Sequence, residues 1–547
     1  MNDHSKTGPN NPLRFKDLQA RDRDIIVEGL KHGVSRRDML KWLSSAGIAA
    51  AAGVGILTDA GVALAQTPKR GGKMRVAAHS TSAKDTLDPA KQTLSTDYIR
   101  GYIYFNGLTR LDGNTAAQPE LAESFEPNAT ATEWMFRLRR GVEFHDGKSL
   151  TAQDVVYSLM RHKDPAVGSA AKALSEQIDS VSADGPDVVR VKLKAPYADL
   201  PIMLGTSHFM ILRDGTKDFA TAIGTGPFKM KEFNPGVRSI GTRNPNYFKQ
   251  GRPYLDELEF FGIQDKVART NALVSGDVQA ITNLPPNAID EVKSRPDLAL
   301  LATPSATFSE IVMMVDRKPT DSLDMRMAIK YLLDRERYVK TVLKGYGQLG
   351  NDHVVPPNDP LYNKDLPQRS VDLDKAKFHL AKAGLTNGKL ELIVSDAAVG
   401  TVEMGQILQQ SAARAGLTID LKREPADGFW SNIWLKRAFY GGQWNARPTI
   451  DIMLSLGWIS GAVWNEAQFK DATFDKLIVQ GRSELDPAKR KQIYSDIQKI
   501  LYDQGGNGVF AFQDFLDGLS AKVKGITPVP IGYLGGYAFA DTVWLES

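Results

Sequence analysis

The chain has 547 residues, more than one hydrophobic core normally fills, so two or more lobes are expected. Lys and Arg number 68 against 64 Asp and Glu, and no basic run interleaved with aromatic residues occurs, which argues against a nucleic-acid partner. The absence of cysteine excludes disulfides and thiolate metal sites, and it fits an oxidising compartment.

The first 65 residues have the pattern of an export signal. Residues 35–41, S-R-R-D-M-L-K, precede an Ala/Gly-rich apolar run over 46–57, and residues 63–65, A-L-A, form a small-residue cleavage signal. The heptapeptide resembles the twin-arginine motif, with Met39 where phenylalanine is usual. A membrane anchor is the alternative, but the apolar run is shorter than the ~20 residues of a span. We therefore expect export by the twin-arginine route to the periplasm.

The stretch from 120 to 160 is predicted to form a strand, a turn and a capped helix. Trp134, Phe136 and Leu138 alternate with polar or flexible side chains, the period of a half-buried strand. Residues 151–154, T-A-Q-D, have the spacing of a capping box, in which a carboxylate three residues into the helix favours its positive end.

The wording of this stretch resembles a family signature. It contains L-A-E-S, then L-R-R-G-V-E-F-H-D-G and T-A-Q-D-V-V-Y-S-L, the pattern of the family 5 solute-binding proteins of ABC importers, the oligopeptide- and dipeptide-binding group. Residues 224–228, G-T-G-P-F, and 243–247, R-N-P-N-Y, resemble further markers of that family. A phosphate cradle at 224–226 is disfavoured because Pro227 removes a backbone donor. The resemblance implies that a captured solute is delivered to permease subunits in the membrane.

Other elements follow from periodicity and caps. The sequence predicts strands at 71–78, 188–193 and 390–394; helices at 96–105, 325–343, 372–384 and 486–502; a helix end, turn and short strand over 271–283; and strand-like runs in 509–547.

The resemblance implies an α/β fold: a two-lobed periplasmic binding protein of type II, cluster C, with an extra subdomain. Lobe I would comprise 72–112, 224–310 and 513–547, the inserted subdomain 113–223, and lobe II 311–512. Because the chain would cross twice between lobes, closure would be a hinge motion that buries the ligand.

Catalysis finds little support in the sequence. No G-x-S-x-G elbow, H-E-x-x-H or P-loop occurs, and the eight histidines are scattered without helical ligand spacing. We expect no enzyme, no cofactor and no metal site. A hydrolase assembled from distant residues, and a sensory or chaperone-like binding protein on the same scaffold, are the alternatives.

An aromatic cluster carries the most ligand information. Trp430, Trp434 and Trp444 fall within 15 residues, and core packing is the alternative reading, above all for Trp434. The resemblance places Trp430 and Trp444 at the ligand pocket. In peptide-binding relatives the third residue after the second tryptophan is an aspartate that receives the peptide's ammonium group. Here that residue is Arg447, a donor to anions, unless it pairs with Asp451 or another acid.

The predicted ligand-binding residues come from both lobes. Asn283 lies at a strand end, where open α/β sheets place ligand contacts, although a loop-capping amide is the alternative; Ser95 is placed by the resemblance near the cleft. The full set is Arg447, Trp444, Asn445, Ala446, Trp430, Asn283 and Ser95. The expected ligand is a small organic solute, either a peptide, an opine-like compound or an acidic conjugate, and the protein is expected to be a monomer.

Overall fold

The structure is a computed structural model that describes Ile26, Met39, Leu43 and residues 67–546. The predicted export signal therefore lies outside the described residues, those three positions aside. Residues 71–543 form one compact unit, and no helix among the described residues is long and apolar enough to cross a membrane.

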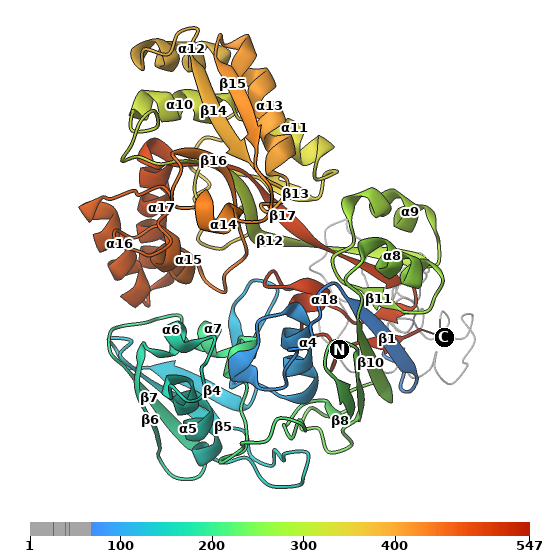
Figure 1. The fold of residues 1–547 in the computed structure, drawn as a ribbon. Coiled ribbons are helices and arrows are strands. Elements are labelled where there is room, and N and C mark those ends of the chain that lie inside the picture. Colours follow the sequence, from blue (N-terminus) through green and yellow to red (C-terminus); the bar gives the residue numbers. More distant parts are fainter. Residues whose placement is uncertain (1–25, 27–38, 40–42, 44–66, 547) are drawn as a thin grey trace. The chain divides into compact units, whose positions relative to one another are not determined.

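A mixed sheet of 11 strands runs through the described part of this unit (Figure 1), in the order β15-β14-β16-β12-β17-β11-β1-β10-β9-β8, with β13 paired to β17. Its strands are β1 (Lys73–Ala78), β8 (Phe228–Asn234), β9 (Arg238–Arg243), β10 (Glu257–Gly262), β11 (Ala280–Ile281), β12 (Leu298–Met313), β13 (Gly347–Leu349), β14 (Lys389–Val394), β15 (Thr418–Arg423), β16 (Phe439–Trp444) and β17 (Asn507–Ser520). The predicted strands at 71–78 and 390–394 are confirmed by β1 and β14.

Two long antiparallel strands connect the halves of this sheet. β12 and β17 pair from Leu298↔Ser520 to Val312↔Asn507, with an irregularity between Thr303 and Thr307. At one end β12 pairs with β16, and at the other β17 pairs with β11. This is the connectivity that two lobes joined by a pair of crossing strands would have, although the lobe boundaries given above stay a prediction.

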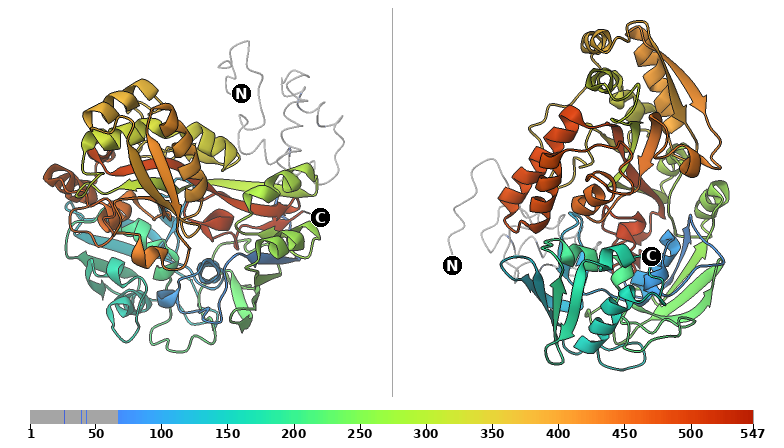
Figure 2. Two further views of the ribbon diagram at one scale, coloured as in Figure 1. Left: turned by 45° about the horizontal axis from the view of Figure 1, so that its top comes forward. Right: turned by 60° about the vertical axis from the view of Figure 1, so that its left-hand side comes forward.

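A second, four-stranded sheet has its own core. It has the order β4-β5-β7-β6 and consists of β4 (Ala122–Pro127), β5 (Glu133–Leu138), β6 (Ile178–Ala183) and β7 (Val188–Leu193), with α5 (Ala152–Met160) packed beside it (Figure 2). The alternation in β5 buries Trp134, Phe136 and Leu138, as predicted. The Asp154 carboxylate accepts from the Thr151 backbone N–H at 2.8 Å, which gives the expected cap.

The remaining short elements connect these sheets. They are α4 (Ser95–Tyr104), β2 (Thr109–Leu111), β3 (Ala117–Pro119), α6 (Lys172–Ser175), α7 (Leu200–Leu204), α8 (Lys266–Val274), α9 (Ile289–Ser294), β18 (Val523–Lys524), α18 (Tyr533–Gly536) and β19 (Trp544–Leu545). The predicted helix end, turn and short strand over 271–283 correspond to α8 and β11.

The second half of the chain is rich in helices. They are α10 (Leu323–Leu332), α11 (Arg335–Thr341), α12 (Leu373–Lys382), α13 (Thr401–Arg414), α14 (Phe429–Asn432), α15 (Ile450–Gly457), α16 (Ala472–Ser483) and α17 (Pro487–Gln504). One helix over 325–343 was a wrong prediction, because the chain forms α10 and α11 there. The Asp334 side chain accepts from the Arg337 N–H and starts a new helix, while Leu333 is extended.

The G-T-G-P segment is explained by packing. Gly224 and Gly226 lie against the backbone of Tyr104, where a side chain at either position would clash. The Gly226 N–H donates to the Tyr104 carbonyl at 3.0 Å. These glycines allow a close backbone approach, which agrees with the rejection of a phosphate cradle.

Candidate functional site

Arg447 lies just beyond the carboxyl end of β16. The strand ends at Trp444, Asn445 is exposed, and the Ala446 N–H donates to the Thr307 hydroxyl at 3.1 Å, which ties this turn to β12. The Arg447 guanidinium carbon is 5.8 Å from the Trp444 ring centroid. The turn thus places the predicted residues Trp444, Asn445, Ala446 and Arg447 in one segment.

Arg447 has no carboxylate partner among the residues that the structure describes. Its hydrogen bond goes to the adjacent carbonyl of Ala446, at 3.4 Å. Asp451, the partner considered from sequence, bonds instead to Arg482 at 3.1 Å, so that alternative is wrong. Burial lowers the pKa of Arg447, and the phenol of Tyr98 opposes this change. A half-buried guanidinium without a counter-charge favours binding of an anion.

Tyr98 belongs to α4, in the N-terminal half of the chain. Its ring lies 5.5 Å from that of Tyr537 and 5.3 Å from that of His208, between centroids. Tyr98 and Arg447 are close enough to interact electrostatically, although they lie 349 residues apart in the sequence (447 − 98). Sequence reasoning placed Tyr98 only in a helix; its register on α4 carries no signal for this proximity.

Ser95 begins α4, and Asn283 follows β11. The Ser95 hydroxyl is buried and lies 2.5 Å from the Ser80 hydroxyl. Asn283 is exposed just after β11, with φ of 54°, and its carbonyl accepts from Arg269 at 3.0 Å. A ligand role for either residue stays a prediction. Of the two, only Asn283 presents an open side chain.

His79 links these positions and was missed as a site candidate. Its Nδ1 lies 2.8 Å from the Thr282 hydroxyl, and its ring centroid 4.8 Å from that of Tyr533. Burial, together with the charge of Arg269, lowers the pKa of His79 to about 4. The imidazole is therefore neutral near pH 7 and acts as a hydrogen-bonding group.

The tryptophans form a connected group around one buried carboxylate. The Trp444 and Trp434 indole N–H groups donate to Glu466 at 2.5 and 3.0 Å. Burial raises the pKa of Glu466. Burial also raises the pKa of Glu310, and the neighbouring charge of Glu466 raises it further. Trp444 is buried, and its indole packs on the inner side of the turn that carries Arg447. Trp430, in contrast, is exposed.

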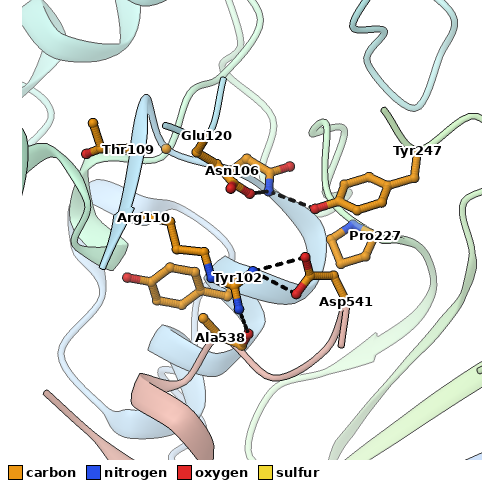
Figure 3. A pocket seen from close by; sticks show the side chains of 10 residues that line it. Tyr102, Asn106, Thr109, Arg110, Glu120, Pro227, Tyr247, Ala538 and Asp541 are labelled. Atoms are coloured by element: carbon orange, nitrogen blue, oxygen red, sulfur yellow. Dashed lines mark hydrogen bonds and ion pairs between the residues drawn. The ribbon is translucent and has the colours of Figure 1, made fainter. Parts of the chain in front are cut away.

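A small cavity shown in Figure 3 is an ion-pair site and not a solute pocket. Its volume is about 10 Å³, and Arg110 contacts Asp541 at 2.8 Å in its lining. Lys249, which does not line the cavity, contacts the same carboxylate at 2.9 Å. Burial would raise the pKa of Asp541, but these two cations lower it to about 2. Among the described residues there is also no cluster of three or more His, Asp or Glu that could hold a metal ion.

Comparison with known proteins agrees with this architecture. Residues 116–466 match the model of bacterial extracellular solute-binding proteins, family 5. The chain is 26% identical over 481 residues to the glutathione-binding protein GsiB of Shigella flexneri, covering 83% of this chain and 92% of that one.

Two solved structures share the fold. HbpA2 from Haemophilus parasuis superposes with a TM-score of 0.77 at 21% identity, covering 87% of this chain and 100% of that one. AgaA from A. tumefaciens R10, in complex with agropinic acid, gives 0.69 at 23% identity, covering 87% and 99%.

The sheet joined by two crossing strands, together with these likenesses, defines a two-lobed α/β solute-binding protein. Since the family model covers more than half of the sequence, the chain belongs to the bacterial extracellular solute-binding proteins, family 5.

Proposed function

We propose that this protein captures a small organic solute with an anionic or carbonyl-rich end, held by Arg447 and Tyr98, and delivers it in the periplasm to an ABC permease. The observation that carries the proposal is the half-buried Arg447 guanidinium with no carboxylate partner among the described residues. An unpaired cation at this depth is costly unless a ligand neutralises it. Binding is proposed without catalysis or a cofactor.

The ligand class follows from the sign of this charge. A free peptide amino-terminus would bring an ammonium group beside a guanidinium, adding repulsion to desolvation. A carboxylate, or the acyl oxygen of a blocked amine, would accept hydrogen bonds from the guanidinium and from the Tyr98 phenol. The glutathione named for GsiB and the agropinic acid bound to AgaA show that such scaffolds are associated with more than ordinary peptides.

Two-lobe closure completes the proposal. We assign lobe I to 72–112, 224–310 and 513–547, with 113–223 inserted, and lobe II to 311–512. With this division Tyr98 and Arg447 lie on different lobes, so a ligand that contacts both favours the closed state. Export by the twin-arginine route and a monomeric state belong to the same proposal.

Calorimetry with matched dipeptides tests the charge argument. We expect the N-acetylated dipeptide to bind more tightly than the free one, and Arg447→Gln to weaken it by about 10- to 100-fold, the value of a hydrogen bond to a charged group. Arg414→Gln, at an exposed arginine at the end of α13, is the control. Micromolar binding of free dipeptides, unchanged in Arg447→Gln, would show the arginine to be structural.

A further inference from the structure

Beyond Arg447, two tryptophans expose their rings next to buried ones. Trp430 and Trp464 have exposed fractions of 46% and 37%, and Val463, which precedes Trp464 in the chain, has 85%. Ring centroids are 5.9 Å apart for Trp430 and Trp434, 6.0 Å for Trp434 and Trp464, and 6.1 Å for Trp464 and Trp444. Successive rings meet edge to face, at 79°, 60° and 61°, so the four indoles form a connected chain of rings, which we call the tryptophan shelf (Trp430, Trp434, Trp444 and Trp464).

Buried polar groups fix the positions of residues in the tryptophan shelf. Glu466 accepts the indole N–H bonds of Trp434 and Trp444, fixing both ring orientations. Asn465 is also buried, and its amide donates to the Phe469 carbonyl at 2.7 Å while its oxygen accepts from the Phe469 N–H at 3.1 Å. Trp464 thus stands on a loop anchored by the two residues that follow it.

This anchoring is costly, which points to a role for the ring positions. Glu466 is buried beside Glu310, a second buried carboxyl, whose Oε2 accepts from Asn507 at 2.8 Å. Two carboxyl groups this close to each other in the interior are unfavourable for folding compared with apolar residues. Rigid aromatic surfaces offer a large contact area with little loss of side-chain entropy on binding.

We propose that the tryptophan shelf binds the planar aromatic or conjugated part of the solute whose anionic end is held by Arg447. The inference rests on the proposed function. The occupant follows from continuity, because Trp444 contacts both the Arg447 guanidinium, at 5.8 Å, and Trp464. The ligand class is therefore an amphipathic anion, with one charged group and one flat apolar group. A second copy of the chain on the exposed rings is the competing occupant.

Two carboxylates of similar size separate stacking from simple apolar contact: phenylacetate, whose ring is planar, and cyclohexylacetate, whose ring is not. Calorimetry on the mature protein should show tighter binding of phenylacetate. Trp464→Leu and Trp430→Leu should each reduce this preference by about three- to tenfold, the value of a lost aromatic pair, and leave cyclohexylacetate unchanged. Phe378→Leu, at an exposed aromatic residue on α12, is the control. A ratio of two affinities is insensitive to the fraction of folded protein.

The outcomes distinguish this inference from the proposed function. If Arg447→Gln weakens both probes but the tryptophan variants keep the preference, the shelf is not a subsite and the anion site stands. If the tryptophan variants lose the preference but Arg447→Gln changes nothing, the shelf stands and the anion site fails. The inference is also overturned if neither probe binds wild-type protein, or if the tryptophan variants alter only self-association in sedimentation.

Discussion

A buried ion pair joins the proposed inserted subdomain to the proposed second lobe, and we predict that it stabilises the closed state. Arg490 on α17 donates to both carboxylate oxygens of Asp199, each at 2.6 Å. The side chains are only 17% and 4% exposed. Nearby, the Ala198 N–H donates to the Arg482 carbonyl at 2.9 Å. Residues near the two partners in the sequence belong to separate hydrophobic cores: Leu200 to the core around Phe136, and Tyr494 to the core around Trp458.

The geometry sets the size of the effect. Removing one partner of a fully buried pair costs about 3–5 kcal/mol, and the partial exposure of Arg490 reduces this to about 1.5–3 kcal/mol. If the ion pair forms only on closure, its removal destabilises the closed state and leaves the stability of each hydrophobic core unchanged. Arg490→Met should then weaken ligand binding by about 10- to 100-fold, with little change in the urea midpoint of the unliganded protein.

Calorimetry and solution scattering together test this prediction. Wild-type protein with saturating N-acetylated dipeptide should show a smaller radius of gyration, and Arg490→Met should need more ligand to reach it. Arg140→Met, which removes an exposed pair with Asp187, is the control. The reasoning fails if Arg490→Met binds as wild type does, or if it destabilises the unliganded protein by the whole predicted amount.

Local sequence signals predicted most of the helices and strands. They failed at residues 325–343, where a second helix cap divides the predicted helix. The alternation in Trp134–Leu138 and the Asp154 cap each depend on neighbours in sequence, and both are confirmed. The apolar period from Ala328 to Leu333 continues through Asp334 in the sequence, so periodicity alone favoured one helix. The Asp334 carboxylate instead caps a new helix, because a capped start is worth about 1 kcal/mol and can outweigh a continued turn.

The candidate site was predictable only where one short segment carries it. Arg447 was found because it departs from the family pattern three residues after Trp444. Trp464 was not, since its ring exposure depends on how Asn465 and Glu466 are buried, which no local pattern expresses. The Asp199–Arg490 pair joins residues 291 apart in the chain. From the sequence alone, each of the two would be predicted to be an ordinary charged residue on the surface.

Two further predictions concern export and pH. Changing Arg36 and Arg37 together to lysine should leave a longer precursor in the cytoplasm, detectable by fractionation and mass; normal export would refute the twin-arginine route. The second concerns Asp517, a buried acid that accepts the Leu534 N–H at 2.6 Å. Burial raises the pKa of Asp517 to about 8, against an unfolded value of about 4. The folded state thus holds the proton more tightly than the unfolded state does. The contribution of Asp517 to the free energy of unfolding is therefore complete below pH 4 and is lost as pH rises through 8; the loss is at most on the order of 5 kcal/mol. Asp517→Asn imitates the neutral acid and should remove that part of the pH dependence in urea unfolding at pH 5, 7 and 9, whereas Asp427→Asn, at an exposed position, should not. If the free energy of unfolding of Asp517→Asn changes with pH as steeply as that of the wild-type protein, the reasoning is refuted. The Asp517 carboxyl would then be ionised in the folded protein.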